Sequence, residues 1–296
     1  MRVEPDTTIN EERSKKKYGP LKSTFKRLSR NKLAVAGLMI FLFLIIIAII
    51  APVIMPYRYD MADFSSTFSK PSRAHLLGTD ELGRDILSRL MYGTRYSLQI
   101  GLFSVMGACV GGIIFGSIAG YFGGWAGNLI MRFLDIVQAI PGMVMAIAIS
   151  AVLGPGFGKC IIALLISMIP GFSRMMRASI LNVRKMEYLE AASSINCRSF
   201  RIIRRHVLPN AMSPIIVQAT MSVPMSILIA ATLSYVGLGV QPPDPEWGAM
   251  LSAGRSYIRD YPHLVVFPGI LIMIAVLSLN LFGDGLRDAL DPKLKD

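Results

Sequence analysis

The sequence predicts an all-α integral membrane protein with six transmembrane helices and both termini on the cytoplasmic side. Of its 296 residues, 53% are hydrophobic and 17% are charged, a composition typical of a chain that crosses a membrane several times. The apolar residues form long runs that polar segments separate. Lys and Arg are concentrated in the segments that six crossings would place inside, which agrees with the positive-inside rule.

The net charge of +12 does not point to a nucleic-acid partner, because the excess lies in the N-terminal tail and in one central segment. Cytoplasmic loops facing an anionic leaflet explain this distribution better. The three cysteines and three histidines are scattered and show no C-x-x-C spacing. We therefore expect neither a disulfide nor a metal site on this chain.

The first 95 residues divide into a tail, a span and a loop. Residues 1–32 are polar and basic, and within them Leu21–Asn31 is either a short amphipathic surface helix or part of a disordered tail. The unbroken apolar run Leu33–Met55 is long enough to cross a bilayer and too long for a cleaved signal peptide. The polar segment 56–95 is then an extracytoplasmic loop.

Residues 96–283 form the predicted core of five further spans. The second span, Tyr96–Phe122, carries glycines at G-x-x-x-G spacing, which lets helix backbones approach closely. The third is Phe133–Leu153, where Arg132 and Asp135 have the i, i+3 spacing of a local ion pair. We expect that pair to face a partner chain rather than a substrate.

The remaining spans are interrupted by prolines. The fourth, Cys160–Met176, is broken by Pro170 and Gly171, which neighbouring helices or water can compensate. The fifth is Ala211–Leu238 and the sixth is Leu264–Phe282, followed by the cytoplasmic tail 284–296. Gln218 and Asn280 either face a water-lined pathway or bond to neighbouring helices.

A polar, basic segment, 177–210, separates the fourth and fifth spans. Its helix formers predict one short helix over Met186–Asn196 and a second over Ser199–Val207, which Leu208, Pro209 and Asn210 end before the next span. Two such helices on the cytoplasmic face suit a socket in another protein. The alternative is an ordinary positive-inside loop.

No motif in the chain supplies energy or catalysis. The sequence contains no G-x-x-x-x-G-K-[ST] phosphate loop and no evident hydrolytic set. Ionisable residues within the apolar runs are few, which disfavours a self-energised secondary carrier. A membrane scaffold that only assembles partners is a further alternative. An energy source outside the chain is the simplest inference.

Several motifs resemble those of ABC importer permeases. The sequence EAASSIN, followed by HVLPN, is similar to the EAA motif, matching it at Glu190, Ala191, Ala192, Leu208 and Pro209, whereas Asn196 replaces the family's glycine. The blocks HLLGTDELGRDILSRLMYGTRYSL, MRFLDIVQAIPGMVMAIAI, SYVGLGVQPPDPEWGAML and GDGLRDALDPK resemble the C-type permease subunit of the dipeptide/oligopeptide/nickel family.

This resemblance implies a type I importer permease in the cell membrane of a prokaryote. The expected partners are a homologous B-type permease, two cytoplasmic ATPase subunits that bind ATP and Mg, and an extracytoplasmic solute-binding protein that delivers a peptide or nickel. No cofactor is expected on this chain. The residues implied in ATPase coupling are Glu187, Tyr188, Glu190, Ala191, Ala192, Asn196, Leu208 and Pro209.

A second set of candidates lies in the two extracytoplasmic loops. Asp80, Arg84, Asp85, Pro243 and Trp247 are candidates for contact with the binding protein or for gating. The alternative is that these loops are folded caps over the helix bundle, with Trp247 as an interface anchor.

Overall fold

The computed structural model describes residues 26–186 and 199–290 of the chain. Five of its helices are long and apolar enough to cross a membrane: α2 (Lys32–Ile54), α3 (Ile86–Tyr121), α6 (Phe157–Val183), α9 (Leu208–Tyr235) and α11 (His263–Leu290). A sixth crossing is made if α4 (Gly124–Gln138) and α5 (Gly142–Leu153) count as one span. The prediction of an all-helical membrane protein is confirmed.

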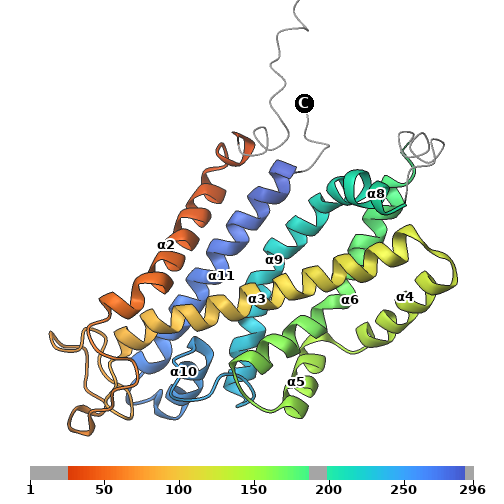
Figure 1. Ribbon diagram of the computed structural model, residues 1–296. Helices are drawn as coiled ribbons and strands as arrows, with labels where there is room; N and C mark the ends of the chain where they lie inside the picture. Colours follow the sequence, from red (N-terminus) through yellow and green to blue (C-terminus); the bar gives the residue numbers. More distant parts are fainter. Residues whose placement is uncertain (1–25, 187–198, 291–296) are drawn as a thin grey trace, which may run out of the picture.

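Shorter elements connect these helices. They are the 3₁₀ turns η3 (Phe64–Ser66) and η5 (Arg255–Tyr257), the helices α8 (Ser199–Ile202) and α10 (Trp247–Gly254), and the π turn η4 (Ile203–Val207). In Figure 1, α3 runs obliquely across the bundle, while α10 and the long α2–α3 connection lie together at one end.

The bundle has two distinct ends. At the end that we call the tail end, α2 begins and α11 finishes, and Leu28, Ala34 and Ala289 pack together there. The ends of α3 and α6 also meet at the tail end, where Arg184 donates to the carbonyl of Tyr121 at 3.0 Å. Residues 55–85 and 236–262 cover the opposite end, and we call them the loop layer (Figure 1).

The second span begins ten residues before the predicted Tyr96. Asp85 caps the start of α3, because its Oδ2 accepts hydrogen bonds from the backbone N–H and the hydroxyl of Ser88 at 2.8 and 2.7 Å. A capping carboxylate satisfies N–H groups that a helix otherwise leaves without partners. The predicted loop 56–95 therefore ends at Asp85, and the first turns of α3 pack against the loop layer.

The predicted third span is not one straight helix. The chain bends by 87° between α4 and α5, and Pro141 stands at the N-cap position of α5. A proline disfavours helical geometry at the residue before it, which accounts for a break at Ile140. The predicted span Phe133–Leu153 therefore consists of two helices, and the first of them begins earlier, at Gly124.

Two proline sites behave differently from the prediction. Helix α6 continues through Pro170 without interruption. At Pro209 the short helix does not stop, because α8, η4 and α9 follow one another without a break from Ser199 to Tyr235. The wider π turn over Ile203–Val207 makes room for the Pro209 ring, which in a regular α-helix clashes with the carbonyl four residues earlier.

The most extensive helix contact is between α3 and α6. At Gly112 an added Cβ would come within 2.9 Å of the backbone carbon of Phe172, and at Gly116 within 2.6 Å of the Met176 Cβ. The predicted close approach at the glycine-rich face is confirmed. Around it lies the core of Phe172, Met176 and Ile180.

Candidate functional site

A groove of about 590 Å³ opens at the tail end between α6, α9 and α11. It extends along α9 from Asn210 to Met221, which is about 16 Å at the rise of an α-helix. The groove is lined by Met175, Ser179, Asn182, Val183, Met186, Asn210, Ser213, Pro214, Val217, Gln218, Met221, Arg287 and Leu290. Its volume falls within the range of small-molecule sites, roughly 300–1,000 Å³.

Polar side chains from all three helices line this groove. Ser179 and Asn182 come from α6, Ser213 and Gln218 from α9, and Arg287 from α11. The Gln218 amide also donates to the Ser222 hydroxyl of its own helix at 3.4 Å, and not to a neighbouring helix. Asn280 is exposed on α11 and does not line the groove.

The groove adjoins residues 187–198, the central part of the polar segment 177–210, which we call the coupling segment. Met186, the last described residue after α6, lines it, as does Asn210 in the first turn of α9. Glu187, Tyr188, Glu190, Ala191, Ala192 and Asn196 fall within 187–198 and lie outside the described residues. Of the two remaining coupling candidates, Pro209 is exposed at the start of α9, and Leu208 is partly buried.

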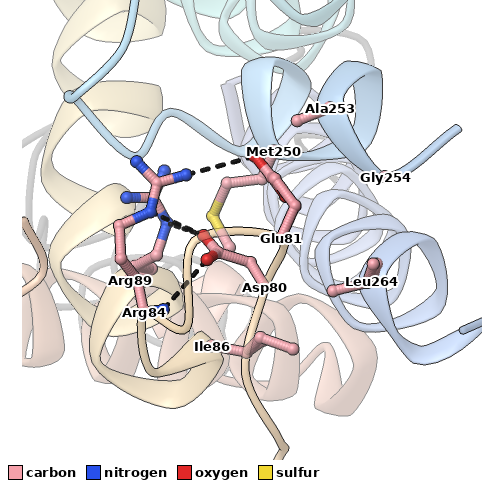
Figure 2. Close-up of a pocket in the computed structure, with 9 residues that line it drawn as sticks. All are labelled: Asp80, Glu81, Arg84, Ile86, Arg89, Met250, Ala253, Gly254 and Leu264. Atoms are coloured by element: carbon pink, nitrogen blue, oxygen red, sulfur yellow. Dashed lines mark hydrogen bonds and ion pairs between the residues drawn. The ribbon is translucent and has the colours of Figure 1, made fainter. Parts of the chain in front are cut away.

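In the loop layer, the Asp80 carboxylate lies between two guanidinium groups (Figure 2). Its Oδ2 accepts from Arg84 Nε at 2.7 Å and lies 3.4 Å from Arg89 Nε, and all three residues are buried. Arg84 Nη2 also reaches Glu81 at 3.3 Å. A buried charge is tolerated only when it is paired and hydrogen-bonded, so this cluster organises the layer.

Beside this cluster is a cavity of about 20 Å³, room for about one water molecule. Figure 2 shows its lining, drawn from the loop before α3, from α3 itself, and from α10 and α11. Arg89 extends the network, since its Nη1 donates to the carbonyls of Tyr59 at 3.0 Å and Pro243 at 3.4 Å. Burial raises the pKa of Tyr59, whose ring stacks on Tyr92.

The second loop is attached to α3 through Glu246 and Trp247. The Glu246 carboxylate caps α10 by accepting from the Ala249 N–H at 2.9 Å, and it accepts from the Ser97 hydroxyl at 3.1 Å. Trp247 is fully buried, and its indole N–H donates to the Leu90 carbonyl at 3.3 Å. A buried indole with a satisfied N–H is a packing element rather than a membrane-interface anchor.

Of the five loop candidates, four are therefore buried inside the loop layer. Asp80, Arg84, Asp85 and Trp247 are each at most 7% exposed, whereas Pro243 is exposed. Asp85 is held between Ser88 and His75, whose Nδ1 lies 3.0 Å from Oδ1. This arrangement is that of a folded cap over the bundle, the alternative reading of these loops.

The charge pair of the third span has a different partner from the predicted one. Asp135 Oδ1 accepts from Arg174 Nη2 at 2.7 Å, joining α4 to α6. The prediction of a local ion pair between Asp135 and Arg132 was therefore wrong. A neighbouring groove of about 470 Å³ is lined by Met131, Asp135, Arg174, Arg177, Ala178 and Leu181.

Sequence reasoning missed Ser97, Arg89, Arg174 and Glu246 as members of these networks. A signal existed for Glu246, because a carboxylate directly before an apolar helix is favoured at a helix N-terminus. No local pattern pointed to Ser97 or Arg174, whose partners are 149 and 39 positions away in the chain.

Two family descriptions match the chain. Residues 112–296 match the binding-protein-dependent transport system inner membrane component. Residues 19–71 match the N-terminal transmembrane domain of oligopeptide transport permease C.

Several named relatives match almost the whole chain. The dipeptide transport system permease protein DppC of Alkalihalophilus pseudofirmus is 47% identical over 93% of this chain and 91% of its own length. The glutathione transport system permease protein GsiD of Pectobacterium atrosepticum is 45% identical, with 96% and 94% covered. The di/tripeptide transport system permease protein DppC of Pseudomonas aeruginosa is 44% identical, with 94% and 93% covered.

Solved transporter structures share the fold. Inward-facing MetNI, a methionine ABC transporter, aligns with a TM-score of 0.56 at 20% identity, covering 70% of this chain and 98% of that chain. An amino acid ABC transporter gives 0.53 at 14% identity, covering 68% and 94%. The chain belongs to the inner membrane permease family of binding-protein-dependent ABC transport systems, as a multi-pass, non-catalytic permease component of the C type.

Proposed function

We propose that this permease forms half of the translocation pathway of an ATP-driven importer for di- or oligopeptides. The observation that carries the proposal is the groove between α6, α9 and α11, which opens at the end of the bundle where the coupling segment is attached. The names of the relatives described above refer to the transport of dipeptides, di/tripeptides and glutathione. Those names favour a short peptide over nickel.

The tail end is the cytoplasmic face in this proposal. Basic residues flank the coupling segment on both sides, with Arg184 and Lys185 before it and Arg201, Arg204 and Arg205 after it. Lys and Arg favour the cytoplasmic side of a membrane protein. Both chain termini then lie inside, and the loop layer faces outward.

Coupling is proposed to run through the two helices that border the segment. Glu190 offers a carboxylate that an ATPase arginine can bind bidentately, with Glu187, Tyr188, Ala191, Ala192 and Asn196 shaping the docking helix. A displacement of this segment passes into α6 through Met186 and into α9 through Leu208 and Pro209. Because α6 and α9 both line the groove, such a displacement changes its width.

The proposed assembly contains a homologous B-type permease, two ATPases and a solute-binding protein. ATP and Mg are bound by the ATPases, and no cofactor or nucleic acid is assigned to this chain. On the outer face, Pro243 is our candidate for contact with the binding protein, because its ring is exposed. Asp80, Arg84, Asp85 and Trp247 hold the surface that carries it.

Reconstituted uptake tests this proposal. The full transporter in liposomes should accumulate a labelled dipeptide when ATP and the binding protein are supplied. Ser213→Phe, which fills the groove, should abolish uptake, whereas Met225→Phe on the exposed side of α9 should not. Nickel accumulation without uptake of dipeptides, tripeptides or glutathione would refute the peptide assignment. Unchanged uptake by the Ser213 variant would refute the pathway.

A further inference from the structure

A second groove, of about 290 Å³, lies between α2 and α3 and has Val223 of α9 as its floor. Helix α2 contributes Phe41, Ile45, Ala48 and Ile49, and α3 contributes Arg95, Leu98, Gln99 and Leu102. Both sets follow the i, i+4, i+7 spacing of one helix face. The groove is therefore bounded by two continuous helix faces rather than by loops.

The groove is polar at one end and apolar at the other. Helices α2 and α3 run in opposite directions through the bundle, since α2 ends and α3 begins at the loop layer. Arg95 and Gln99 therefore lie toward the loop layer, on the same side as Ile49. Leu102 and Phe41 lie farther from the loop layer, at the other end of the groove. Only the end near the loop layer, which we call the shallow end, offers hydrogen-bond donors from side chains.

Arg95 is not neutralised within the described part of the chain. Its guanidinium lies over the Tyr92 ring, 5.3 Å from the centroid, and no carboxylate among the described residues pairs with it. No described side chain hydrogen-bonds to Gln99 either. A cation held on an aromatic face at the edge of an apolar groove is suited to an anionic oxygen.

The surface around the groove is apolar. Ile46, Ile50 and Val53 of α2 are 52%, 38% and 86% exposed, and Ile49 on the rim of the groove is 68% exposed. Helix α2 contains an 18-residue stretch with a mean hydropathy of 3.3 and is long enough to cross the bilayer. Acyl chains are the natural neighbours of such a surface.

We propose that this groove binds one phospholipid of the leaflet nearer the loop layer, with an anionic headgroup. Its phosphate accepts hydrogen bonds from Arg95 and Gln99, and one acyl chain lies along Ile45, Leu98 and Leu102 over Val223. The polarity of the groove matches the order of head and tail in a bilayer. The ligand class follows from the unpaired cation at the shallow end and the apolar floor.

Native mass spectrometry of the full-length chain, extracted with the subunits that accompany it, tests this inference. After exchange into mixed phosphatidylglycerol and phosphatidylcholine, phosphatidylglycerol should be retained preferentially. Arg95→Gln should lower its occupancy about tenfold, the loss expected for one charge-assisted contact. Arg255→Gln is the matched control, because Arg255 also lies over a tyrosine, 5.1 Å from the Tyr235 ring, and does not line the groove.

A photo-crosslinker distinguishes lipid from protein in the groove. With p-benzoylphenylalanine at Ile49, ultraviolet light should yield a phospholipid adduct that Arg95→Gln reduces. Equal phosphatidylglycerol occupancy in the Arg95 and Arg255 variants would overturn the proposal. So would an adduct with a companion permease in place of lipid. Neither readout depends on transport, so failure here leaves the importer function untouched.

Discussion

The Ser97 hydroxyl donates a hydrogen bond to the Glu246 carboxylate at 3.1 Å, although 149 positions separate the two residues. The Ser97 oxygen in turn accepts from the backbone N–H of Trp247 at 3.2 Å. This pair attaches the loop before α10 to the first turns of α3. The loop layer is thereby fixed to the same helix that packs on α6.

Removing the Glu246 carboxylate should loosen the loop layer. Glu246→Ala leaves the buried Ser97 hydroxyl and the Ala249 N–H without an acceptor, which should cost about 2–3 kcal/mol, and Glu246→Gln should cost less. Thermal unfolding followed by tryptophan fluorescence measures this, because Trp247 is fully buried. Asp260→Ala, at an exposed carboxylate of the same layer, is the control. Equal midpoints for Glu246→Ala and the control would contradict the role of the pair.

The contact between α3 and α6 should not tolerate a side chain at Gly112. Alanine there places its Cβ against Phe172, and overpacking of this kind costs about 1–3 kcal/mol. Gly269→Ala in α11 is the matched control, since an added Cβ meets no atom within 4 Å and alanine favours a helix. Detergent thermal stability should fall for the first variant and not for the second. A stable Gly112→Ala protein would show that the two backbones are farther apart.

Asp135 should be energetically coupled to Arg174 and not to Arg132. Double-mutant cycles with Asp135→Asn and either Arg174→Gln or Arg132→Gln measure the two coupling energies. Because the Asp135 and Arg174 side chains are each 54% exposed, we expect roughly 0.5–1 kcal/mol for the first cycle. The second cycle should give a value near zero. Coupling of Asp135 to Arg132 and not to Arg174 would instead support the local ion pair.

Local pattern was enough to predict an all-helical membrane protein and the glycine-rich contact. It placed the start of α3 at Tyr96 because Asp85, Arg89 and Arg95 make Asp85–Arg95 look like a loop. Those charges are accommodated because the loop layer folds over the first turns of α3, where Arg89 bonds to Tyr59 and Pro243. That arrangement depends on residues from both loops. Because the two loops are far apart in the chain, a local stretch of sequence cannot reveal it.

Prolines limited the prediction in a similar way. Pro141, Pro170 and Pro209 are equally strong local signals, yet the chain bends at the first and continues helically through the other two. Tertiary packing decides between these outcomes, because neighbouring helices can support a helix that lacks one backbone hydrogen bond. The Asp135–Arg174 pair depends on the same long-range information.

The proposed docking of the coupling segment to an ATPase predicts a separation of assembly from insertion. Glu190→Arg with Ala191→Trp reverses a charge and adds bulk where an ATPase groove should receive the helix. The variant should reach the membrane in normal amounts, and the ATPases should no longer co-purify with it. The matched control is Glu81→Arg, a charge reversal in the loop layer at the far end of the bundle, which should leave co-purification intact. ATPase retention by the Glu190 variant would mean that this helix does not dock.

Asn196 offers a finer test, because the EAA motif has glycine at this position. If a turn between the two coupling helices requires a positive φ, glycine adopts it freely and asparagine at a cost of roughly 1 kcal/mol. A β-branched side chain is far more restricted. Asn196→Gly should therefore preserve ATP-dependent uptake, and Asn196→Val should impair it while insertion stays normal. Equal uptake by the two variants would mean that position 196 needs no left-handed turn, and the coupling segment would then require a different geometry from that of the EAA motif.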